Sequence, residues 1–483
     1  MNLAKLLHSW FPELISDCDI SGLHNDSRQV KPGYLFLAYP GAAADGRLFM
    51  RQAVAAGAVA IIYEPELLPE ACLPMPDVPC LPMPGLGKRL AALANSFYEY
   101  PSRDLAVTGV TGTNGKTTIA YQLAQAYELL EQRAAYIGTL GEGTIQTLNP
   151  LANTTPDGLC LQQLLHRYRS EGLHQVCMEV SSHALSQKRV DQIDFVHAIY
   201  TNLSHEHLDY HHTMEAYAVA KSELFALATL KSAVINLDDV YASYMAKRLN
   251  ATCQKITYGL YSDCDVRAIH IQTSRIGSEF EVVSPWGTYP LQINTLGQFN
   301  IYNSLAVFTT LLMNGYDPTK LVPIMAKLQA APGRMEVICQ EPCIIVDYAH
   351  TPDALDNVLS TLNQLKAGRL MVVFGCGGDR DKAKRPIMGR IASQHADLSI
   401  VTSDNPRTED PLQIIADISQ GLLSSRAVLK IVDRKQAIEK AISLADKEDI
   451  ILIAGKGHEA YQQIGHERFD FSDQNIVRDL MEH

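Results

Sequence analysis

The residues with the clearest chemical potential lie in the segment Val107–Thr118, which reads Val-Thr-Gly-Val-Thr-Gly-Thr-Asn-Gly-Lys-Thr-Thr. It follows an apolar strand pattern and opens a helical one, an order that is typical of a loop that binds a nucleoside triphosphate. We expect Gly109, Gly112 and Gly115 to adopt positive φ and to turn backbone N–H groups toward a phosphate at the helix N-terminus.

Lys116 and Thr117 complete this loop. The Lys116 ammonium would reach the terminal phosphates of ATP, and the Thr117 hydroxyl is an oxygen ligand of the kind that phosphate-bound Mg²⁺ prefers. The strict pattern G-x-x-x-x-G-K-[ST] has its first glycine where this chain has Val110, so the loop is a variant. The alternative is a glycine-rich turn with an incidental lysine. The predicted ATP-binding loop consists of Gly112, Thr113, Asn114, Gly115, Lys116, Thr117 and Thr118.

Composition places the chain among ordinary globular proteins. Its 483 residues are 47% hydrophobic and 19% charged, and this length fits about three domains of roughly 150 residues. No apolar run approaches the roughly 18 residues of a membrane span, and the N-terminus lacks a signal-peptide pattern. We therefore expect a cytoplasmic protein without a membrane partner.

Charge and cysteine usage narrow the function further. The net charge of −12 argues against non-specific nucleic-acid binding, which needs a basic surface. Any anionic substrate must therefore be held by local basic clusters. The ten cysteines are scattered without CxxC pairs, which favours free thiols in a reducing compartment and argues against zinc.

The alternation of apolar runs predicts an α/β fold with three domains. Residues 1–100 mix short strands and helices and end in a proline-rich run that can form only an irregular or edge segment. Residues 101–333 alternate strands with helices, as a mostly parallel sheet requires, and change to a small antiparallel sheet within residues 255–293. Residues 334–483 alternate again, as in a Rossmann-like domain.

The strands expected in these domains are short apolar runs bounded by polar or glycine-rich loops. They are Tyr34–Ala38, Ala58–Tyr63, Gln175–Val180, Val196–Tyr200, Ser232–Asn236, Cys343–Asp347, Leu370–Phe374, Leu398–Thr402, Val428–Val432 and Asp449–Ala454.

Polar loops follow four of the strands in the third domain, namely Tyr348–His350, Gly375–Arg380, Asp404–Arg407 and Gly455–Glu459. Ligands of open α/β sheets bind at the carboxyl ends of the strands. We therefore expect a binding site at this edge.

The same edge of the middle domain would carry the ATP loop, Glu179–His183 and Thr201–Asp209. Glu179 and His207 could hold a metal ion beside the phosphates and help to neutralise charge during phosphoryl transfer. The alternatives are a solvated carboxylate and a histidine-rich surface loop.

Several segments together resemble the Mur ligases, over essentially the whole chain. They are TGTNGKTT, MEVSSHAL, TNLSHEHLDYH, GQFNIYN, APGRME, VDYAHTPDAL and FGCGGDRDKAKRP. The resemblance implies a UDP-binding N-terminal α/β domain, a central P-loop ATPase and a C-terminal domain that binds an amino acid. It also implies that ATP phosphorylates the γ-carboxylate of D-glutamate in UDP-N-acetylmuramoyl-L-alanyl-D-glutamate, and that an amine attacks the acyl phosphate, in cytoplasmic peptidoglycan precursor synthesis.

The resemblance implies that Lys116, Lys221 and His207 are catalytic. Lys221 would react with CO₂ to form a carbamate, N6-carboxylysine, and would become an anionic metal ligand, although spacing alone favours a surface lysine. The implied ligands of Mg²⁺ are Thr117, Glu179, His207 and the Lys221 carbamate.

Two further groups of contacts are implied by the resemblance. Around ATP, beyond the loop, they are Asn300, Asn303, Arg334, Asp347 and His350. Asp347 could instead cap a helix before Pro352, and Asn300 could be a turn residue. Around the UDP substrate they are Asn25, Ser27, Ala42, Ala43, Ala44, Asn153, Thr154, Thr155, Ser181, Gln187 and Arg189.

The loop Asp404–Arg407 resembles the family motif that recognises meso-diaminopimelate. Arg407 can take the distal carboxylate in two parallel hydrogen bonds while Glu459 pairs with the distal ammonium. Lysine lacks that carboxylate and would leave Arg407 unpaired, at a cost of roughly 2–5 kcal/mol. An ordinary Asx-Pro turn is the alternative. The implied contacts are Arg380, Asp404, Asn405, Pro406, Arg407, Gly455 and Glu459.

Three alternatives remain open at this point. The chain could be the same ligase with L-lysine, ornithine or another diamino acid, or a nucleotide-dependent switch that forms no amide bond. It could also be a folylpolyglutamate synthetase, although the Asp404–Arg407 loop and the first domain argue against that. We expect ATP, Mg²⁺, the UDP-N-acetylmuramoyl-dipeptide and meso-diaminopimelate as small-molecule partners, no nucleic acid, and a monomer.

Overall fold

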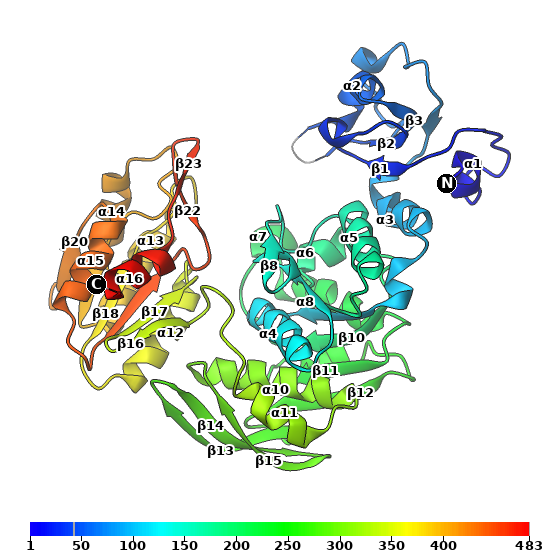
Figure 1. Ribbon diagram of the computed structural model, residues 1–483. Coiled ribbons are helices and arrows are strands. Elements are labelled where there is room, and N and C mark those ends of the chain that lie inside the picture. The colour runs from blue at the N-terminus through cyan, green and yellow to red at the C-terminus, as the bar shows by residue number, and fades with distance from the viewer. Residues whose placement is uncertain (42–43, 483) are drawn as a thin grey trace. The chain divides into compact units, whose positions relative to one another are not determined.

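The structure is a computed structural model that describes residues 1–41 and 44–482. The chain forms two compact units, and Figure 1 shows the order of their elements. The first unit consists of Met1–Lys116, Leu130–Ala233 and Tyr241–Lys255; the second consists of Thr117–Leu129, Val234–Val240 and Ile256–His483. The three-domain division at residues 100 and 333 stays a prediction. Within the described ranges, no helix is both long enough and apolar enough to cross a membrane.

The N-terminal region forms a parallel four-stranded sheet with the order β1-β2-β3-β4. Strand β4 falls in the proline-rich run and lies at the sheet edge, as predicted, because Pro82 cannot donate a hydrogen bond to a neighbouring strand. The elements are β1 (Gly22–His24), β2 (Tyr34–Ala38), β3 (Ala58–Tyr63), β4 (Cys80–Pro82), α1 (Leu3–Leu7), α2 (Met50–Ala55) and α3 (Leu86–Phe97).

An eleven-stranded sheet follows, with the order β15-β14-β13-β12-β11-β10-β5-β9-β6-β7-β8. Its strands are β5 (Ala106–Thr111), β6 (Ala134–Gly138), β7 (Gly141–Thr144), β8 (Thr147–Asn149), β9 (Gln175–Glu179), β10 (Phe195–Tyr200), β11 (Ser232–Asn236), β12 (Gln254–Gly259), β13 (Val266–Ser274), β14 (Gly277–Ser284) and β15 (Gly287–Ile293). The helices of this part of the chain are α4 (Lys116–Leu129), α5 (Gly158–Ser170), α6 (Ser182–Ser186), α7 (Leu208–His211), α8 (Met214–Ser222), α9 (Ala242–Ala246), α10 (Gln298–Met313) and α11 (Pro318–Met325).

The antiparallel part of this sheet differs from the prediction in two respects. Among the strands of residues 254–293, β12 pairs with β13 in parallel, and β13, β14 and β15 run antiparallel to one another as a continuation of the large sheet. The antiparallel strands β7 and β8 were not predicted at all. They are so short that the alternation of apolar and polar residues gives too few positions to identify them.

The C-terminal region is a six-stranded sheet with the order β16-β17-β21-β18-β19-β20, in which only the edge strand β16 runs antiparallel. A separate hairpin, β22–β23, follows it. The elements are β16 (Glu336–Gln340), β17 (Cys343–Asp347), β18 (Leu370–Phe374), β19 (Leu398–Val401), β20 (Ala427–Lys430), β21 (Ile450–Ala454), β22 (Tyr461–Ile464), β23 (Glu467–Asp470), α12 (Pro352–Leu365), α13 (Lys384–His395), α14 (Pro411–Ser419), α15 (Arg434–Leu444) and α16 (Asp473–Met481).

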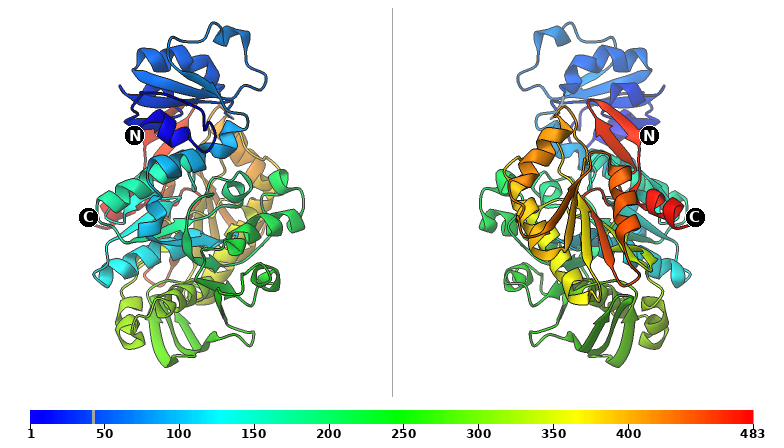
Figure 2. Two further views of the ribbon diagram at one scale, coloured as in Figure 1. Left: turned by 90° about the vertical axis from the view of Figure 1, so that its right-hand side faces the viewer. Right: turned by 90° about the vertical axis from the view of Figure 1, so that its left-hand side faces the viewer.

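Helices cover both faces of this C-terminal sheet, as the views in Figure 2 show. On β17, Ile345 packs with residues of α12, α13 and α14, whereas the adjacent Ile344 packs with residues of α15 and α16. Because both faces are buried, the strands are continuous apolar runs instead of alternating ones. This explains why their positions could be predicted closely from the sequence.

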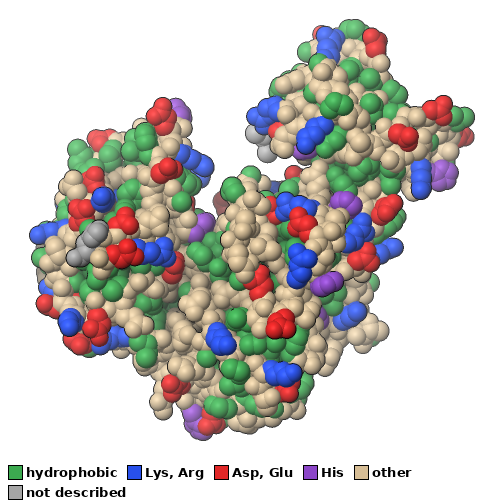
Figure 3. All heavy atoms as spheres, viewed as in Figure 1, with side chains coloured by type: hydrophobic (Ala, Val, Ile, Leu, Met, Phe, Trp, Pro, Cys, Tyr) green, Lys and Arg blue, Asp and Glu red, His purple; other side chains and the backbone are tan. Residues whose placement is uncertain are grey.

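The surface mixes charges of both signs. On the face shown in Figure 3, Lys and Arg side chains are interspersed with Asp and Glu side chains. All ten cysteines are free thiols.

Candidate functional site

The segment after β10 holds the predicted ATP loop in place. The Thr113 N–H donates to the Asn202 carbonyl at 2.8 Å, and the Asn114 N–H donates to the Asn202 side-chain oxygen at 3.0 Å. The Thr201 hydroxyl donates to the Asn114 carbonyl at 2.6 Å. These two loop N–H groups therefore do not turn toward a phosphate. If the loop binds a phosphate as predicted, its donors have to be other N–H groups, such as those at the start of α4.

The glycines of the loop have two different roles. Gly112 and Gly115 have φ of 151° and 88°, as predicted, and a Cβ at Gly112 would collide with the Thr201 hydroxyl. The prediction for Gly109 was wrong, because this residue lies inside β5 and is not among the positive-φ glycines. A Cβ on Gly109 would come within 2.8 Å of the Phe195 ring. Gly109 is needed for packing on the sheet, and sequence spacing does not separate that role from a loop role.

Lys116 and Lys221 converge on the Gly112 carbonyl. Their Nζ atoms donate to this oxygen at 2.9 and 2.7 Å, respectively. Lys221 lies on α8 and is 1% exposed, so the alternative of a surface lysine was wrong. Burial, together with the nearby charge of Lys116, lowers the pKa of Lys221 well below its ordinary value. The amine of Lys221 is therefore chemically distinct from that of a solvated lysine.

Tyr217 contacts both the predicted ATP loop and Lys221, and the sequence did not identify it as a site residue. Its hydroxyl is 3.2 Å from the Thr113 hydroxyl, and its ring centroid is 4.7 Å from the Lys221 Nζ. The Tyr217 ring also stacks on the His211 ring, with the centroids 5.0 Å apart. Tyr217 precedes Lys221 by about one helical turn, and residues at this spacing share a helix face. That spacing was the signal that could have identified it.

The predicted metal ligands Glu179 and His207 have contrasting environments. Glu179 is 1% exposed and accepts hydrogen bonds from the Tyr136 hydroxyl at 2.6 Å and the Thr139 N–H at 2.8 Å. The alternative of a solvated carboxylate was therefore wrong. His207 is exposed, has φ of 58°, and packs edge-on against the His183 ring. Across residues 1–41 and 44–482, no group of three or more Asp, Glu, His or Cys side chains is arranged to hold a metal ion.

Thr155 joins several of the predicted UDP-substrate residues. Its hydroxyl donates to the Glu179 carbonyl at 2.8 Å and accepts from the Ser181 N–H at 3.1 Å, while its carbonyl accepts from Arg189 at 3.0 Å. Arg189 also donates to the Gln187 side-chain oxygen at 2.9 and 2.6 Å. All these acceptors of Arg189 are uncharged, so its positive charge can serve an anionic ligand.

The other predicted UDP-substrate residues have different contacts. Thr154 contacts the Thr139 hydroxyl at 3.1 Å, and Asn153 is exposed. In the N-terminal sheet region, the Asn25 amide donates to the Tyr39 hydroxyl at 3.1 Å and the Ser27 hydroxyl donates to Gln52 at 3.2 Å. Ala44 is exposed, whereas Ala42 and Ala43 lie outside the described residues.

The predicted residues around the ATP base and ribose fall on two segments. Asn300 and Asn303 lie on α10 and are joined by a hydrogen bond of 2.9 Å, and the Asn300 amide donates to the Leu296 carbonyl at 2.8 Å. Asn300 is therefore buried in a helix and is not a turn residue.

Arg334, Asp347 and His350 lie at the start of the C-terminal region. The Arg334 guanidinium lies 4.5 Å from the centroid of the Tyr348 ring. Asp347 accepts the backbone N–H groups of Met335 and Ala349, both at 2.7 Å. Asp347 is not a helix cap, because Thr351 caps α12. His350 is exposed.

The four polar loops predicted at the carboxyl edge of the C-terminal sheet do meet there. The Asn405 amide donates to Glu459 at 2.8 Å, the Arg407 guanidinium donates to the Gly378 carbonyl at 2.6 Å, and the Gly455 N–H donates to the Asp347 carbonyl at 3.0 Å. The first two of these bonds link the second, third and fourth loops, and the Tyr348 ring of the first loop lies 5.4 Å from the His458 ring of the fourth.

Backbone geometry at this edge explains two of its residues. Gly455 has φ of 115°, and a Cβ there would lie 2.6 Å from an Asp404 carboxylate oxygen. Arg407 has φ of 49°, which is uncommon for a side chain of this size. Pro406 is buried and Arg380 is exposed.

Two buried cations at this edge were not among the predicted residues. Lys456 is fully buried and donates to the Asn405 side-chain oxygen at 3.1 Å and to Glu459 at 3.3 Å. Arg434 is also buried, with its guanidinium 2.8 Å from the Asp473 carboxylate and 3.9 Å from that of Asp404. Lys456 lies inside the Gly455–Glu459 loop, so its place in the sequence was the available signal.

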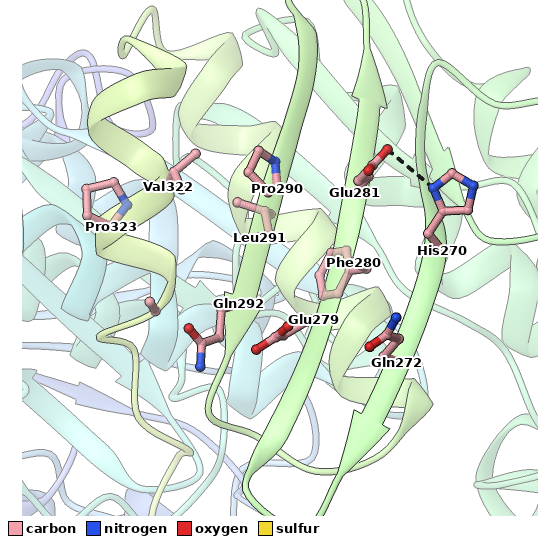
Figure 4. Close-up of a pocket in the computed structure, with 11 residues that line it drawn as sticks. His270, Gln272, Glu279, Phe280, Glu281, Pro290, Leu291, Gln292, Val322 and Pro323 are labelled. Carbon is pink, nitrogen blue, oxygen red and sulfur yellow. Dashed lines mark ion pairs between the residues drawn. The ribbon is translucent and has the colours of Figure 1, made fainter.

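A separate cavity of about 540 Å³ lies between α11 and the strands β13–β15, and Figure 4 shows its lining. Phe280, Leu291 and Val322 give it an apolar part, and His270 and Glu281 form an ion pair of 3.3 Å at one side. Its lining contains neither lysine nor arginine. It therefore lacks the positive charge that the phosphates of ATP or UDP require.

Comparisons with known proteins match three successive segments that cover most of the chain. The Mur ligase family catalytic domain matches residues 19–98, the Mur ligase middle domain matches residues 110–311, and the Mur ligase glutamate ligase domain matches residues 333–457.

Individual relatives are similar over nearly the full length. The chain is 44% identical over 482 residues to UDP-N-acetylmuramoyl-L-alanyl-D-glutamate--2,6-diaminopimelate ligase of Chromobacterium violaceum, covering 98% of this chain and 97% of the relative. It is 44% identical over 472 residues to the enzyme of the same name in Pseudomonas aeruginosa, covering 97% and 96%. A solved structure of a ligase of that name is 38% identical, has a TM-score of 0.72, and covers 100% of this chain and 99% of that one. From these matches, together with the predicted ATP loop on which Lys116 and Lys221 converge, we conclude that this chain belongs to the Mur ligase family.

Proposed function

We propose that this chain is an ATP-dependent, ADP-forming ligase that joins meso-2,6-diaminopimelate to UDP-N-acetylmuramoyl-L-alanyl-D-glutamate. The observation that carries the proposal is the convergence of Lys116 and the buried Lys221 on the Gly112 carbonyl of the phosphate loop. The names of relatives that are 44% identical support the choice of substrates. The reaction would be one cytoplasmic step of peptidoglycan precursor synthesis.

The chemistry has two balanced steps. A γ-carboxylate oxygen of D-glutamate attacks the terminal phosphorus of ATP, the bond from that phosphorus to the bridging oxygen breaks, and ADP leaves. An amine of the amino acid then attacks the acyl carbon, the carbon–oxygen bond to phosphate breaks, and the amine loses a proton. Lys116 would stabilise the charge on the transferred phosphoryl group, while the loop held by Thr201 and Asn202 keeps this donor in position.

The oxygen donors of this set fit Mg²⁺, which takes hard oxygen ligands, and His207 would add a nitrogen ligand. The Thr117 hydroxyl, the Glu179 carboxylate, His207 and a Lys221 carbamate would hold it, together with substrate phosphates. When bound, Mg²⁺ would neutralise phosphoryl charge. The buried position of the Lys221 amine supports the carbamate, because only an unprotonated amine reacts with CO₂.

Arg407 and Glu459 would recognise the distal end of the amino acid. The only hydrogen bond from the Arg407 side chain to the described residues goes to an uncharged carbonyl, so its charge can pair with the distal carboxylate. Glu459 would take the distal ammonium.

Replacing Arg407 with alanine is expected to remove most of the preference for meso-diaminopimelate over L-lysine, because only the former has a carboxylate for the guanidinium. The expected loss is about 2–5 kcal/mol of discrimination, or roughly 30-fold or more in the ratio of kcat/KM values. Competition between the two amino acids, followed by product mass, measures it. Comparable efficiency on both amino acids in the unmodified enzyme would contradict the assigned specificity.

Reconstitution tests the proposed function itself. Purified protein with ATP, Mg²⁺, the UDP-N-acetylmuramoyl-dipeptide and each diamino acid in turn should release phosphate and form the tripeptide product only when all components are present. Nucleotide binding without substrate-dependent phosphate release would instead indicate a switch protein.

A further inference from the structure

We propose that Lys456 is a positioning residue for the incoming diamino acid, because it fixes Asn405 and Glu459 so that one Glu459 oxygen faces the ligand. The inference rests on the proposed function, in which Asn405 and Glu459 contact the amino acid. It adds a residue that would never touch the substrate.

The hydrogen bonds around Lys456 determine the orientation of both neighbours. The Asn405 side-chain oxygen accepts from the Lys456 Nζ at 3.1 Å and from the Gln463 N–H at 2.9 Å. The amide nitrogen of Asn405 must then point the other way, where it donates to the Oε2 atom of Glu459 at 2.8 Å. Lys456 donates to this same Oε2 atom at 3.3 Å.

Glu459 is therefore held through one oxygen only. Within the described residues, its Oε1 atom has no hydrogen-bond partner, and its side chain is 19% exposed. A carboxylate accepts up to about four hydrogen bonds. The oxygen that remains can accept from a ligand ammonium without disturbing the contacts of the other.

The protein surroundings keep the Lys456 ammonium in place. Its side chain is 0% exposed, and its Nζ lies 5.4 Å from the centroid of the Tyr461 ring and 5.9 Å from that of Phe471. The rings exclude water, so the ammonium depends on Asn405 and Glu459 for its polar contacts. A buried charge of this kind is retained only with such partners.

The charge balance of this cluster also favours a cationic ligand. The two cations Lys456 and Arg434 face the carboxylates of Asp404, Asp473 and Glu459. Over these five side chains the negative charges exceed the positive ones by one, apart from Arg407, whose charge is proposed to pair with the distal carboxylate of the ligand. An ammonium of the amino acid would neutralise this excess at Glu459, the most exposed of the three carboxylates.

The variant Lys456→Met, which has a similar volume and no charge, tests this role. It should raise the KM for meso-diaminopimelate by about tenfold or more, by analogy with the loss of a group that orients a metal ligand. The KM for ATP should stay within about twofold of the unmodified value, since the variant changes only the carboxyl edge of the C-terminal sheet, where the amino acid is proposed to bind. The exposed Lys435→Met on α15 is the matched control and should leave both values unchanged.

A double-mutant cycle with Glu459→Gln separates positioning from a general structural role. If Lys456 acts through Glu459, Lys456→Met should add little to the KM in the Glu459→Gln background. Lys456→Gln, which keeps a donor but no charge, should give an intermediate KM and provides the answer if Lys456→Met does not fold. Thermal unfolding of every variant reports folding.

Each outcome is decisive. An unchanged KM for the diamino acid in a folded Lys456 variant, or an equal effect in both backgrounds, overturns the role of Lys456 while the proposed function stands. Absence of tripeptide with the unmodified enzyme and any diamino acid overturns the proposed function, and this inference with it.

Discussion

Replacing Lys116 with methionine is expected to lower kcat/KM by about a thousandfold, the upper range for removing one donor that stabilises a developing anion. Lys116 brings a positive charge to the phosphate loop, where its Nζ contacts the Gly112 and Thr113 carbonyls at 2.9 and 2.7 Å. Methionine has a similar length but cannot interact with a phosphoryl oxygen. The loop itself should keep its shape, because Thr201 and Asn202 hold it through contacts that do not involve Lys116.

Product formation, measured by phosphate release and mass, and ATP affinity, measured by calorimetry, together check this expectation. Lys247→Met is the matched control, since Lys247 is an exposed lysine after α9. The thermal unfolding temperature of both variants should match that of the unmodified protein. If Lys116→Met forms product within about tenfold of the unmodified rate, Lys116 is not a catalytic residue.

Replacing Lys221 with alanine is expected to lower activity at least about a hundredfold, more than is typical for the loss of a group that merely supports a metal ligand. The buried Lys221 amine is positioned by the Gly112 carbonyl at 2.7 Å and lies under the Tyr217 ring. Addition of the amine to CO₂ forms a nitrogen–carbon bond, releases one proton and produces a carbamate anion. Alanine cannot form this anion and leaves a space beside the loop.

Short carboxylates such as formate or acetate should restore part of the activity of Lys221→Ala, because they can occupy that space with an anionic oxygen donor. Lys188→Ala, at an exposed lysine, should be fully active and should not respond to added carboxylate. Steady-state rates across a carboxylate concentration series provide the measurement. Full activity of Lys221→Ala without any additive would exclude the carbamate.

The sequence was a good guide to the parallel strands. Residues Cys343–Asp347 and Leu370–Phe374 form strands with the predicted bounds. Both are buried on two faces, so their apolar runs are continuous and bounded by polar loops. Short strands were harder to predict from the sequence. The residue pattern of β7 and β8 is too short to distinguish a strand from a turn.

The sequence also determined which loops would gather at each edge. A loop that follows a parallel strand must lie at the carboxyl end of the sheet, so Asp404–Arg407 and Gly455–Glu459 could be placed together without knowing any contact. The predicted ATP loop follows strand β5 directly, so its position at the edge of its sheet could be predicted for the same reason. The roles of the individual site residues remain predictions that the variants described above test.

Only the tertiary structure decided how the side chains pair within these edges. Sequence spacing favoured a surface position for Lys221, yet the fold buries it against the carbonyl of a residue far earlier in the chain. Gly109 has a packing role against Phe195 that no local pattern contains. The role proposed for Lys456 depends on its hydrogen bond to Asn405, which belongs to another loop. Local sequence determines strand, loop and helix because those depend on neighbouring residues. Burial and pairing depend on contacts between distant segments, which exist only once the chain has folded.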